Sequence, residues 1–233
     1  MRFPGKTAMI TGAAGSLGRA VAGAFAAEGT TLALPVRTDE QADFLAASIH
    51  LPVDRVYTGI VNLSVEPAVD SFVDNVQKKF GGIHILINCA GGYAGGKPIE
   101  EVSLGEWDDL MKQNLQTAFL VCKAVLPGMK RAGWGRIVNI GAASALAPGA
   151  RRGPYQVSKR GVITLTETIA EETRGSGITA NTIAPTIIRT EANRLSMPDA
   201  DSSRWVPPDQ IAQCALYLCS DESASITGNT IRM

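Results

Sequence analysis

Tyr155 and Lys159 form a Tyr-x-x-x-Lys pair at the start of a stretch with helical spacing. Side chains four residues apart share one face of a helix, so the phenol and the ammonium are predicted to lie together. A free phenol titrates near pH ~10, and a nearby positive charge favours its ionised form and strengthens it as a proton relay. The pair therefore indicates proton transfer, although an amphipathic helix face would show the same spacing. The one serine between Ile137 and Tyr155 is Ser144, and alanines surround it.

A glycine-rich turn follows the first strand-like run and opens a helical one. It contains Gly12, Gly15 and Gly18, with Ser16 and Leu17 between the last two. Glycine lets the backbone approach a pyrophosphate, and a helix N-terminus favours its negative charge. A bare tight turn also needs glycine, but a position after the first strand of a β-α-β series favours dinucleotide binding.

The end of the second strand-like run predicts which dinucleotide is bound. An acidic residue there would hold the ribose hydroxyls of NAD, but Val36 occupies that position and Arg37 follows it. An arginine pairs with a 2′-phosphate through two hydrogen bonds, so NADP is favoured over NAD. Two alternatives stay open: Arg37 is a solvated surface charge, or Asp39 is the partner of the ribose.

Strand-like and helix-like segments alternate along the chain. This alternation predicts β-α-β units and an α/β fold, with a mostly parallel, doubly wound sheet covered by helices on both faces in one domain, 1–233. The expected strands are Thr7–Thr11, Thr31–Val36, Arg55–Val61, His84–Asn88, Arg136–Ile140 and Ile178–Ala184. The expected helices are Leu17–Glu28, Glu40–Ser48, Pro67–Phe80, Leu104–Arg131, Tyr155–Arg174 and Pro207–Cys219. Thr186–Val206 lacks a clear period and is predicted to be a substrate loop or lid.

Composition excludes several classes of function. The chain has 233 residues, 45% of them hydrophobic, with 22 basic and 22 acidic residues, so no charge excess favours nucleic acid or membrane binding. Four cysteines without a C-x-x-C spacing and two distant histidines predict neither a metal site nor a disulfide framework. With no long apolar run and a strand-like N-terminus, we expect a cytoplasmic protein.

Five motifs in order resemble the short-chain dehydrogenases/reductases. They are TGAAGSLG at Thr11–Gly18, NCAG at Asn88–Gly91, Asn114 in KQNLQTAF, the Tyr155–Lys159 pair, and NTIAPT at Asn181–Thr186. The resemblance implies a Rossmann-like sheet of about seven strands and hydride transfer with a nicotinamide cofactor. It also implies that Lys159 binds the nicotinamide ribose and that Asn114 holds a water joining Lys159 to solvent.

The resemblance also extends the predicted site beyond those motifs. The catalytic group would be Asn114, Tyr155 and Lys159. Residues expected at the cofactor, besides the glycine turn, Arg37 and the Tyr–Lys pair, are Asn62, Leu63, Asn88, Ala90, Gly91, Pro185, Thr186, Ile188 and Thr190. Those expected at the substrate are Tyr93, Ala142 and Ser144.

Two departures from the common family pattern resemble one subgroup, the dihydropteridine reductases. Ala142 stands where the family has its catalytic serine, thirteen positions before Tyr155, and Ser16 replaces the usual second glycine. AGGYAGG at Ala90–Gly96 and NRLSMPDADSSRW at Asn193–Trp205 are also similar to that subgroup. Asn114, Arg37 and the ending ASITGNTIRM, which stops before the usual terminal strand, depart from it.

Three functions follow from these residues. The first is reduction of a pteridine-like or quinonoid compound, whose ring delocalises charge and needs little oxyanion support. Tyr93 would stack on that flat ring; the alternative is that Tyr93 only covers the core. The second is a carbonyl reductase or alcohol dehydrogenase of ketone or 3-oxoacyl type, helped by Ser144 or water, because losing one oxyanion donor costs about 2.7–4 kcal/mol. The third is a catalytically silent NAD(P)-binding protein.

Assembly is predicted from two helical segments. Leu104–Arg131 and Tyr155–Arg174 carry apolar residues on more than one face, among them Val121, Val125, Ile163, Leu165 and Ile169. In the family that these motifs resemble, the two helices form a dimer interface. We therefore expect a homodimer or homotetramer that acts on a small molecule.

Overall fold

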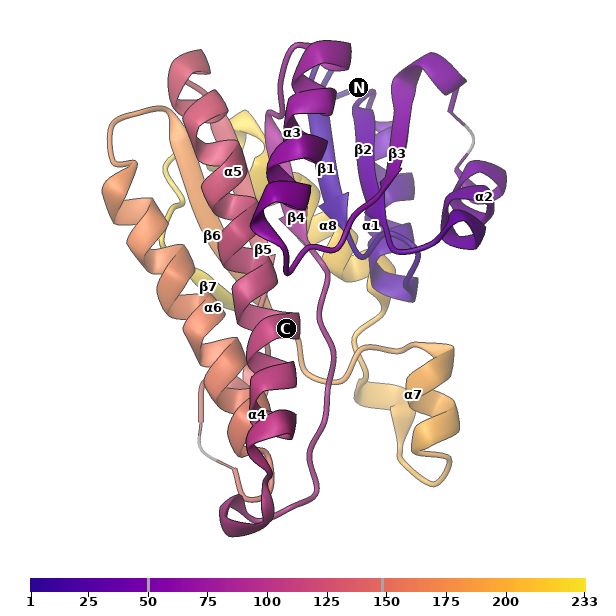
Figure 1. The fold of residues 1–233 in the computed structure, drawn as a ribbon, viewed down its shortest axis with the longest axis vertical. Helices are drawn as coiled ribbons and strands as arrows, with labels where there is room; N and C mark the ends of the chain where they lie inside the picture. The colour runs from indigo at the N-terminus through magenta and orange to yellow at the C-terminus, as the bar shows by residue number, and fades with distance from the viewer. Residues whose placement is uncertain (50, 148) are drawn as a thin grey trace.

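The computed structural model describes residues 1–49, 51–147 and 149–233. A parallel sheet of seven strands in the order β3-β2-β1-β4-β5-β6-β7 lies at the centre of the described chain (Figure 1). The strands are β1 Thr7–Thr11, β2 Thr31–Val36, β3 Val56–Ile60, β4 Ile85–Asn88, β5 Gly135–Ile140, β6 Ile178–Ala184 and β7 Thr230–Arg232. The order reverses direction between β1 and β4, which is where doubly wound sheets bind their ligands.

Helices cover both faces of this sheet, as the alternation predicts. They are α1 Ser16–Ala27, α2 Asp39–Ser48, α3 Glu66–Phe80, α4 Leu104–Leu110, α5 Thr117–Ala132, α6 Gly153–Glu172, α7 Glu191–Ser196 and α8 Pro208–Cys219. Apolar residues of α1, α2 and α8 pack in one core cluster, and those of α3, α5 and α6 pack in a second. Figure 1 shows α3, α5 and α6 side by side in front of the sheet and α1 and α8 behind it.

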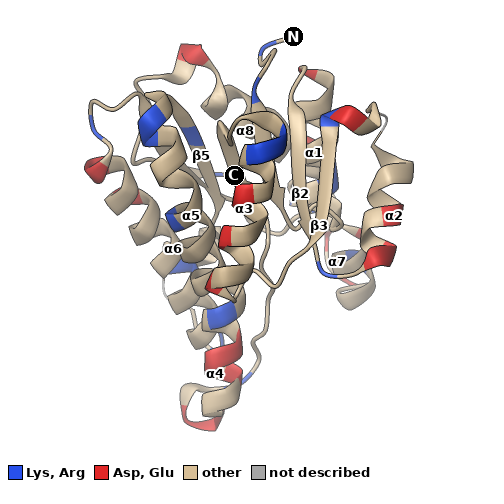
Figure 2. Cartoon of the chain, turned by 45° about the horizontal axis from the view of Figure 1, so that its top comes forward, with Lys and Arg blue, Asp and Glu red and all other residues tan. Residues whose placement is uncertain are grey.

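The central strands are recognisable in the sequence because they are buried on both sides. Every residue of β1, β4, β5 and β6 is buried, which explains their nearly continuous apolar runs. Charged residues of both signs lie on the surrounding helices (Figure 2). No helix within the described ranges combines the length and apolarity needed to cross a membrane.

Three predictions about elements were wrong. The terminal residues do form a strand, β7, which is only three residues long and incompletely buried, so no apolar run announces it. The segment 186–206 was predicted as a loop, but part of it forms the short helix α7. The single helix expected over Leu104–Arg131 is interrupted by a π-helical turn, Met111–Gln116, whose backbone bonds leave no trace in hydrophobic spacing.

The apolar residues singled out for an oligomer interface lie mostly inside the chain. Val121, Val125, Ile163 and Ile169 are buried in the described structure, and Leu165 is partly buried against the same core. The large apolar side chains that the segments Leu104–Arg131 and Tyr155–Arg174 expose are instead Leu104 on α4, Phe119 on α5 and Val157 on α6.

Candidate active site

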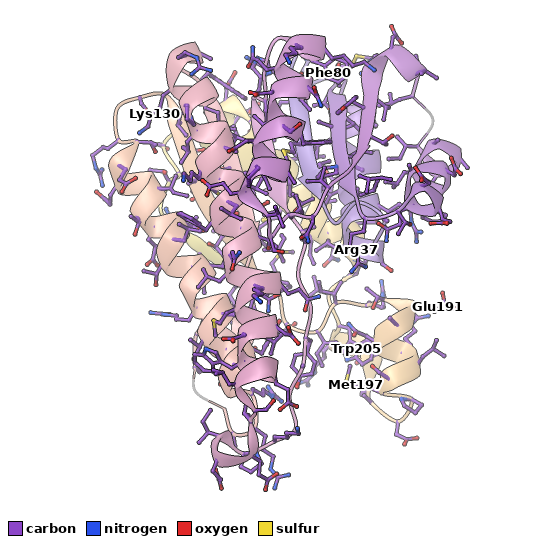
Figure 3. All side chains as sticks on the ribbon, viewed as in Figure 1. Arg37, Phe80, Lys130, Glu191, Met197 and Trp205 are labelled. Atoms are coloured by element: carbon purple, nitrogen blue, oxygen red, sulfur yellow. The ribbon has the colours of Figure 1, made fainter. Side chains whose placement is uncertain are left out.

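The residues predicted to do chemistry follow the carboxyl ends of neighbouring strands. β1 ends at Thr11, which is in register with Asn88 at the end of β4, and Asn88 is in turn in register with Asn139 of β5. Loops leaving adjacent parallel strands therefore meet at one edge of the sheet. Figure 3 shows Arg37 and the α7 segment on this side, with Phe80 and Lys130 at the opposite end.

The turn between β1 and α1 fits a pyrophosphate. Gly12 has φ +66°, and a Cβ there would lie 2.9 Å from the backbone nitrogen of Ala90, so only glycine lets the β1 and β4 loops approach this closely. A Cβ at Gly18 would overlap the carbonyl oxygen of Gly12. The start of α1 has no side-chain cap and no acidic residue in its first turn. Its backbone N–H groups are therefore available to an anion.

The loops around that turn hold one another by side-chain bonds. The Thr11 hydroxyl accepts a hydrogen bond from the backbone N–H of Ala90 at 3.1 Å and donates to the Asn88 side chain at 3.3 Å. The amide of Asn88 then donates to Asn139 at 2.8 Å. This buried chain fixes the β4 loop, including Ala90 and Gly91, against β1.

The cofactor residues expected beyond β2 and β3 lie at the same edge. Arg37 is exposed directly after β2, and its backbone N–H donates to the Gln41 side chain at 2.9 Å. Asn62 and Leu63 follow β3, and the Asn62 side chain accepts bonds from the N–H and hydroxyl of Ser64. In the described chain the Arg37 guanidinium has no ion-pair partner within 4.0 Å, so its charge faces solvent.

Lys159 is buried beside the end of β5. Its ammonium donates a hydrogen bond of 2.9 Å to the carbonyl of Ile140, and a Cβ on Gly91 would lie 3.1 Å from the same nitrogen. Burial lowers the pKa of Lys159 to about 8, and the nearby Cys89 thiol opposes that shift. The lysine thus joins α6 to the end of β5 and lies against the loop after β4.

Tyr155, one helical turn earlier, shows the opposite shift. Burial, aided by the neighbouring Tyr93 phenol, raises its pKa to about 12, while the Arg152 guanidinium lowers it. We expected the Lys159 ammonium to favour the ionised phenol, but Lys159 is not among the groups that shift this pKa, and desolvation sets its direction. The phenol is therefore protonated at neutral pH, which is the state that a proton donor requires.

Asn114 occupies the π-helical turn and binds the loop after β4. Its side-chain oxygen accepts a bond from the N–H of Gly92 at 2.8 Å, and its amide donates to the Gly92 carbonyl at 3.1 Å. The amide also donates to the Ser158 hydroxyl at 3.0 Å, and that hydroxyl donates to the Tyr155 carbonyl at 2.8 Å. Asn114 therefore connects the Gly92 loop to the helix turn that carries Tyr155.

Ser158 had no place in the predicted site, although it is fully buried within it. Serine between the tyrosine and lysine is not informative in the sequence, because its partner Asn114 lies 44 residues away along the chain. Gln156 was also missed. Its amide binds the carbonyls of Ser144 and Ala147, and its side-chain oxygen accepts from the N–H of Gly149.

The three residues expected at the substrate have different surroundings. Tyr93 is 64% exposed, and its ring meets the Tyr155 ring edge-on with centroids 4.9 Å apart. Ala142 is buried directly after β5, so its methyl group adds no hydrogen-bond donor. Ser144 lies in a short 3₁₀ turn, and among the described residues its hydroxyl has no bond to Tyr155.

The loop after β6 begins beside the site. Pro185 is buried and its carbonyl accepts from the N–H of Ala143, which ties this loop to the one after β5. Thr186 is exposed, and Ile188 pairs with Val206. The Thr190 hydroxyl caps α7 by accepting from the N–H of Asn193 at 3.1 Å.

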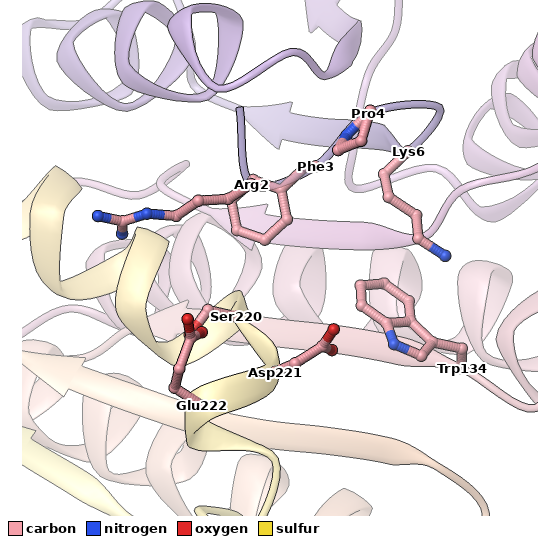
Figure 4. Close-up of a pocket in the computed structure, with 8 residues that line it drawn as sticks. All are labelled: Arg2, Phe3, Pro4, Lys6, Trp134, Ser220, Asp221 and Glu222. Atoms are coloured by element: carbon pink, nitrogen blue, oxygen red, sulfur yellow. The ribbon is translucent and has the colours of Figure 1, made fainter.

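A hollow of about 360 Å³ lies at the opposite, amino end of the strands (Figure 4). Its wall includes Trp134, whose ring is contacted by Lys6 at 4.2 Å and by Arg136 at 4.3 Å from the centroid. This hollow contains none of the residues predicted to do chemistry. Within the described residues, no group of three or more His, Cys, Asp or Glu side chains could hold a metal ion.

A phosphate-cradling turn at the switch point of a parallel sheet, together with the partly buried Tyr155 and the buried Lys159, defines a dinucleotide-dependent oxidoreductase of Rossmann type. Residues 6–201 match the family model described as short chain dehydrogenase, and the chain belongs to that family. It is therefore an NAD(P)-dependent enzyme.

The chain is similar to several characterised proteins over most of its length. It is 37% identical to D-threitol dehydrogenase of Mycolicibacterium smegmatis, covering 97% of this chain and 90% of the relative. It is 30% identical to a 3-oxoacyl-(acyl-carrier-protein) reductase of Vibrio cholerae, covering 100% and 97%. The crystal structure of levodione reductase superposes with a TM-score of 0.92 at 28% identity, covering 100% and 97%. None of these three proteins is named as a dihydropteridine reductase, so they do not support the subgroup that the loop motifs suggested.

Proposed function

We propose that the chain is a carbonyl reductase or alcohol dehydrogenase that interconverts a small ketone and a secondary alcohol. The observation that carries this proposal is the position of Tyr155 on α6, one helical turn from the buried Lys159, at the sheet edge that also carries the phosphate-cradling turn. The named activities of the relatives, a polyol dehydrogenase, a 3-oxoacyl reductase and a levodione reductase, support carbonyl chemistry over pteridine chemistry.

The cofactor-binding residues would be those at the carboxyl edge of β1 to β6. The glycine turn would bind the pyrophosphate, Arg37 the 2′-phosphate of NADP, and Lys159 the nicotinamide ribose. Further contacts would come from the loops that carry Asn62, Leu63, Ala90, Gly91, Pro185, Thr186, Ile188 and Thr190. When bound, the nicotinamide supplies or accepts the hydride.

Tyr155 would donate its proton to the substrate oxygen during reduction and take it back during oxidation. Lys159 would keep positive charge beside the phenol, and its bond to the Ile140 carbonyl fixes the ammonium in place. Asn114 would keep the Gly92 loop against the Tyr155 turn through Ser158. Ala142 contributes no second donor, so Tyr155 is the side chain on which the developing oxyanion depends.

The segment 186–206 would cover the bound substrate. Its two ends are paired through Ile188 and Val206, and Trp205 is buried at its base, whereas α7 between them is largely exposed. A segment pinned at its base with an exposed helix can move without disturbing the sheet. We therefore keep the lid hypothesis for this segment.

A pteridine-like substrate remains the second candidate because of two observations. Ala142 gives no oxyanion donor, and Tyr93 exposes most of its ring at the site. Cofactor oxidation should be measured with quinonoid dihydrobiopterin and with a panel of small ketones and polyol-derived ketoses. Faster turnover of the ketones, improved further by Ala142→Ser, supports carbonyl reduction. Faster turnover of the pterin would replace carbonyl reduction with pteridine reduction as the proposed function. No turnover of either substrate would favour a silent NAD(P)-binding protein.

A further inference from the structure

Arg151 adopts a backbone conformation that residues with side chains rarely adopt. Its φ is +60°, and it is the one non-glycine residue with positive φ among those that the structure describes. The left-handed region brings Cβ too close to the following carbonyl oxygen, so such a residue persists only where its surroundings hold it there. Arg151 is exposed, two residues before α6 begins at Gly153. Core packing does not hold an exposed residue, which leaves the contacts of its backbone as the constraint.

Those contacts join Arg151 to the loop after β4. Its carbonyl accepts a hydrogen bond of 2.8 Å from the N–H of Gly96, and its guanidinium lies 3.5 Å from the Gly96 carbonyl. A second contact lies at the first residue of α6, where a Cβ on Gly153 would come within 2.9 Å of the Ile99 side chain. The loop after β4 is thus held at two points against the start of the helix that carries Tyr155.

Gly95 lies between this attachment and Tyr93. A Cβ on Gly95 would lie 2.7 Å from the hydroxyl oxygen of Tyr93 and 3.0 Å from the carbonyl oxygen of Arg151. The Tyr93 ring in turn meets the Tyr155 ring edge-on, with an angle of 77° between their planes. These four residues therefore pack in series, and the place of Tyr93 depends on the bond between Arg151 and Gly96.

We propose that Arg151 is a positioning residue whose strained backbone holds Tyr93 beside the proton donor, where Tyr93 forms a wall for a flat apolar group of the substrate. Tyr93 is supported on one side by Tyr155 and is still 64% exposed, so the rest of its ring can contact a bound molecule. Aromatic surface gains most from covering another apolar ring. The substrate class is then a ketone that carries a flat apolar substituent on its carbonyl carbon. This inference rests on the proposed carbonyl reductase function.

Three variants separate the backbone of Arg151 from its side chain. A β-branched residue does not accept this φ, glycine accepts it freely, and alanine keeps the backbone but lacks the guanidinium. Each variant is assayed with acetophenone, which carries a flat ring, and with hydroxyacetone, which carries none. Arg151→Val should raise KM for acetophenone by about tenfold or more and change kcat/KM for hydroxyacetone less than about threefold. Arg151→Gly and Arg151→Ala should retain the wild-type KM values.

A double variant tests whether Arg151 acts through Tyr93. Tyr93→Ala should raise KM for acetophenone, and adding Arg151→Val should raise it no further, because both changes remove the same contact. Gly95→Ala disturbs that contact without changing Arg151 and should have the effect of Arg151→Val. Gly105→Ala is its matched control, since a Cβ there meets nothing within 4 Å, and it should change neither substrate.

A spectroscopic measurement reports the place of Tyr93 without turnover. The chain has four tyrosines, which can be labelled with 3-fluorotyrosine, and the Tyr93 resonance in the ¹⁹F NMR spectrum is the one that Tyr93→Phe removes. It should shift in Arg151→Val and in Gly95→Ala but not in Arg151→Gly. Thermal unfolding verifies that each variant is folded.

Three results would overturn the role of Arg151. They are an Arg151→Gly or Arg151→Ala variant as impaired as Arg151→Val, additive losses in the double variant, and an unmoved Tyr93 resonance in Arg151→Val. In each case hydroxyacetone reduction that is lost in Tyr155→Phe leaves the proposed carbonyl reductase function standing. Failure of that function would instead appear as no ketone turnover by the wild type, and the ¹⁹F shifts would then decide whether Arg151 holds Tyr93.

Discussion

Tyr155 and Lys159 show opposite pKa shifts that have one main cause. Removing water from both groups disfavours their charged forms, so the pKa of the phenol rises to about 12 and that of the ammonium falls to about 8. The consequence is a protonated donor and a lysine whose charge changes close to physiological pH. Both properties bear on catalysis and on stability.

Tyr155→Phe should remove the proton donor and little else. The ring and its edge-on contact with Tyr93 are retained, so NADPH affinity, measured by fluorescence titration, should stay unchanged. Turnover should fall by about 10²–10⁴-fold, the range for a general acid. Ser144→Ala is the control and should change little. If it proves as damaging as Tyr155→Phe, Ser144 takes part in proton donation and the role assigned to Tyr155 alone is wrong.

Lys159 should make stability depend on alkaline pH. Between its folded pKa of about 8 and its ordinary value of 10.5, the unfolded chain holds a proton that the folded chain has released. The free energy of unfolding therefore rises with pH through this window, by on the order of 3 kcal/mol. Lys159→Met lacks this proton, so the difference between wild type and variant should grow from pH ~7 to pH ~10 in urea titrations.

The difference in the free energy of unfolding between wild type and Lys159→Met also removes the contribution of other groups that titrate equally in both proteins. Burial raises the pKa of Tyr155 and Cys122, and these groups lower the stability of both proteins at high pH. A difference between wild type and Lys159→Met that stays constant across the window would show that the ammonium is not desolvated in solution.

Arg37 should decide between the two cofactors. Its exposed guanidinium, which has no ion-pair partner among the described residues, lies directly after β2, where a 2′-phosphate would bind. Arg37→Ala should raise the Kd for NADPH by about 10- to 150-fold and leave that for NADH nearly unchanged. Asp39→Asn is the comparison. A wild type that prefers NADH and loses it on Asp39→Asn would assign the ribose to Asp39 instead.

At the scale of elements, the π-helical turn between α4 and α5 has a specific consequence. It directs Asn114 toward the β4 loop, where three hydrogen bonds tie it to Gly92 and Ser158. Through the Ser158 hydroxyl, that bond set reaches the carbonyl of Tyr155. The bound water that the sequence resemblance implies at Asn114 stays a prediction, and the structure adds that the side chain of Asn114 holds protein elements together.

The packing of α1 against its turn predicts opposite effects for two glycines of one helix. A methyl group on Gly18 would overlap the Gly12 carbonyl oxygen, whereas one on Gly23 meets nothing within 4 Å. Gly18→Ala should lower the free energy of unfolding by about 1–3 kcal/mol and weaken cofactor binding. Gly23→Ala should raise it by about 0.5–1 kcal/mol. Urea titrations of both variants test this, and equal effects would mean that the turn is looser than described.

At the scale of the whole molecule, the exposed apolar residues of α5 and α6 predict assembly. Phe119 is 45% exposed and Val157 is 47% exposed, on helices that lie side by side in Figure 1. Apolar and aromatic side chains are typical of the centre of an interface. We expect light scattering to give the mass of a homodimer or homotetramer, and the double variant Phe119→Glu, Val157→Glu to lower it.

The control for that experiment is Phe44→Glu on α2, which changes an equally exposed aromatic residue away from these helices. It should leave the mass unchanged. A monomeric wild type at micromolar concentration would reject the predicted assembly.

Much of this protein can be read from local sequence. The central strands β1, β4, β5 and β6 are rich in apolar residues because the sheet is buried there on both faces, and the glycine turn and the Tyr155–Lys159 spacing are both local patterns. The two loop stretches that resemble dihydropteridine reductases are local as well. Those two stretches favoured one subgroup, but the relatives that match the whole chain are not named as members of it. A few loop residues are weak evidence for a substrate, whereas a match over the entire domain is strong evidence for a family.

Other features were decided only by the tertiary structure, because they depend on groups that are distant in sequence. The Asn114–Ser158 bond spans 44 residues, the pKa of Lys159 depends on how much water its neighbours exclude, and β7 exists only because β6 offers it an edge. The start of α6 at Gly153 likewise lies at a boundary that no hydrophobic period marks. Periodicity encodes which element forms, whereas desolvation and long-range hydrogen bonds depend on how the elements are packed together.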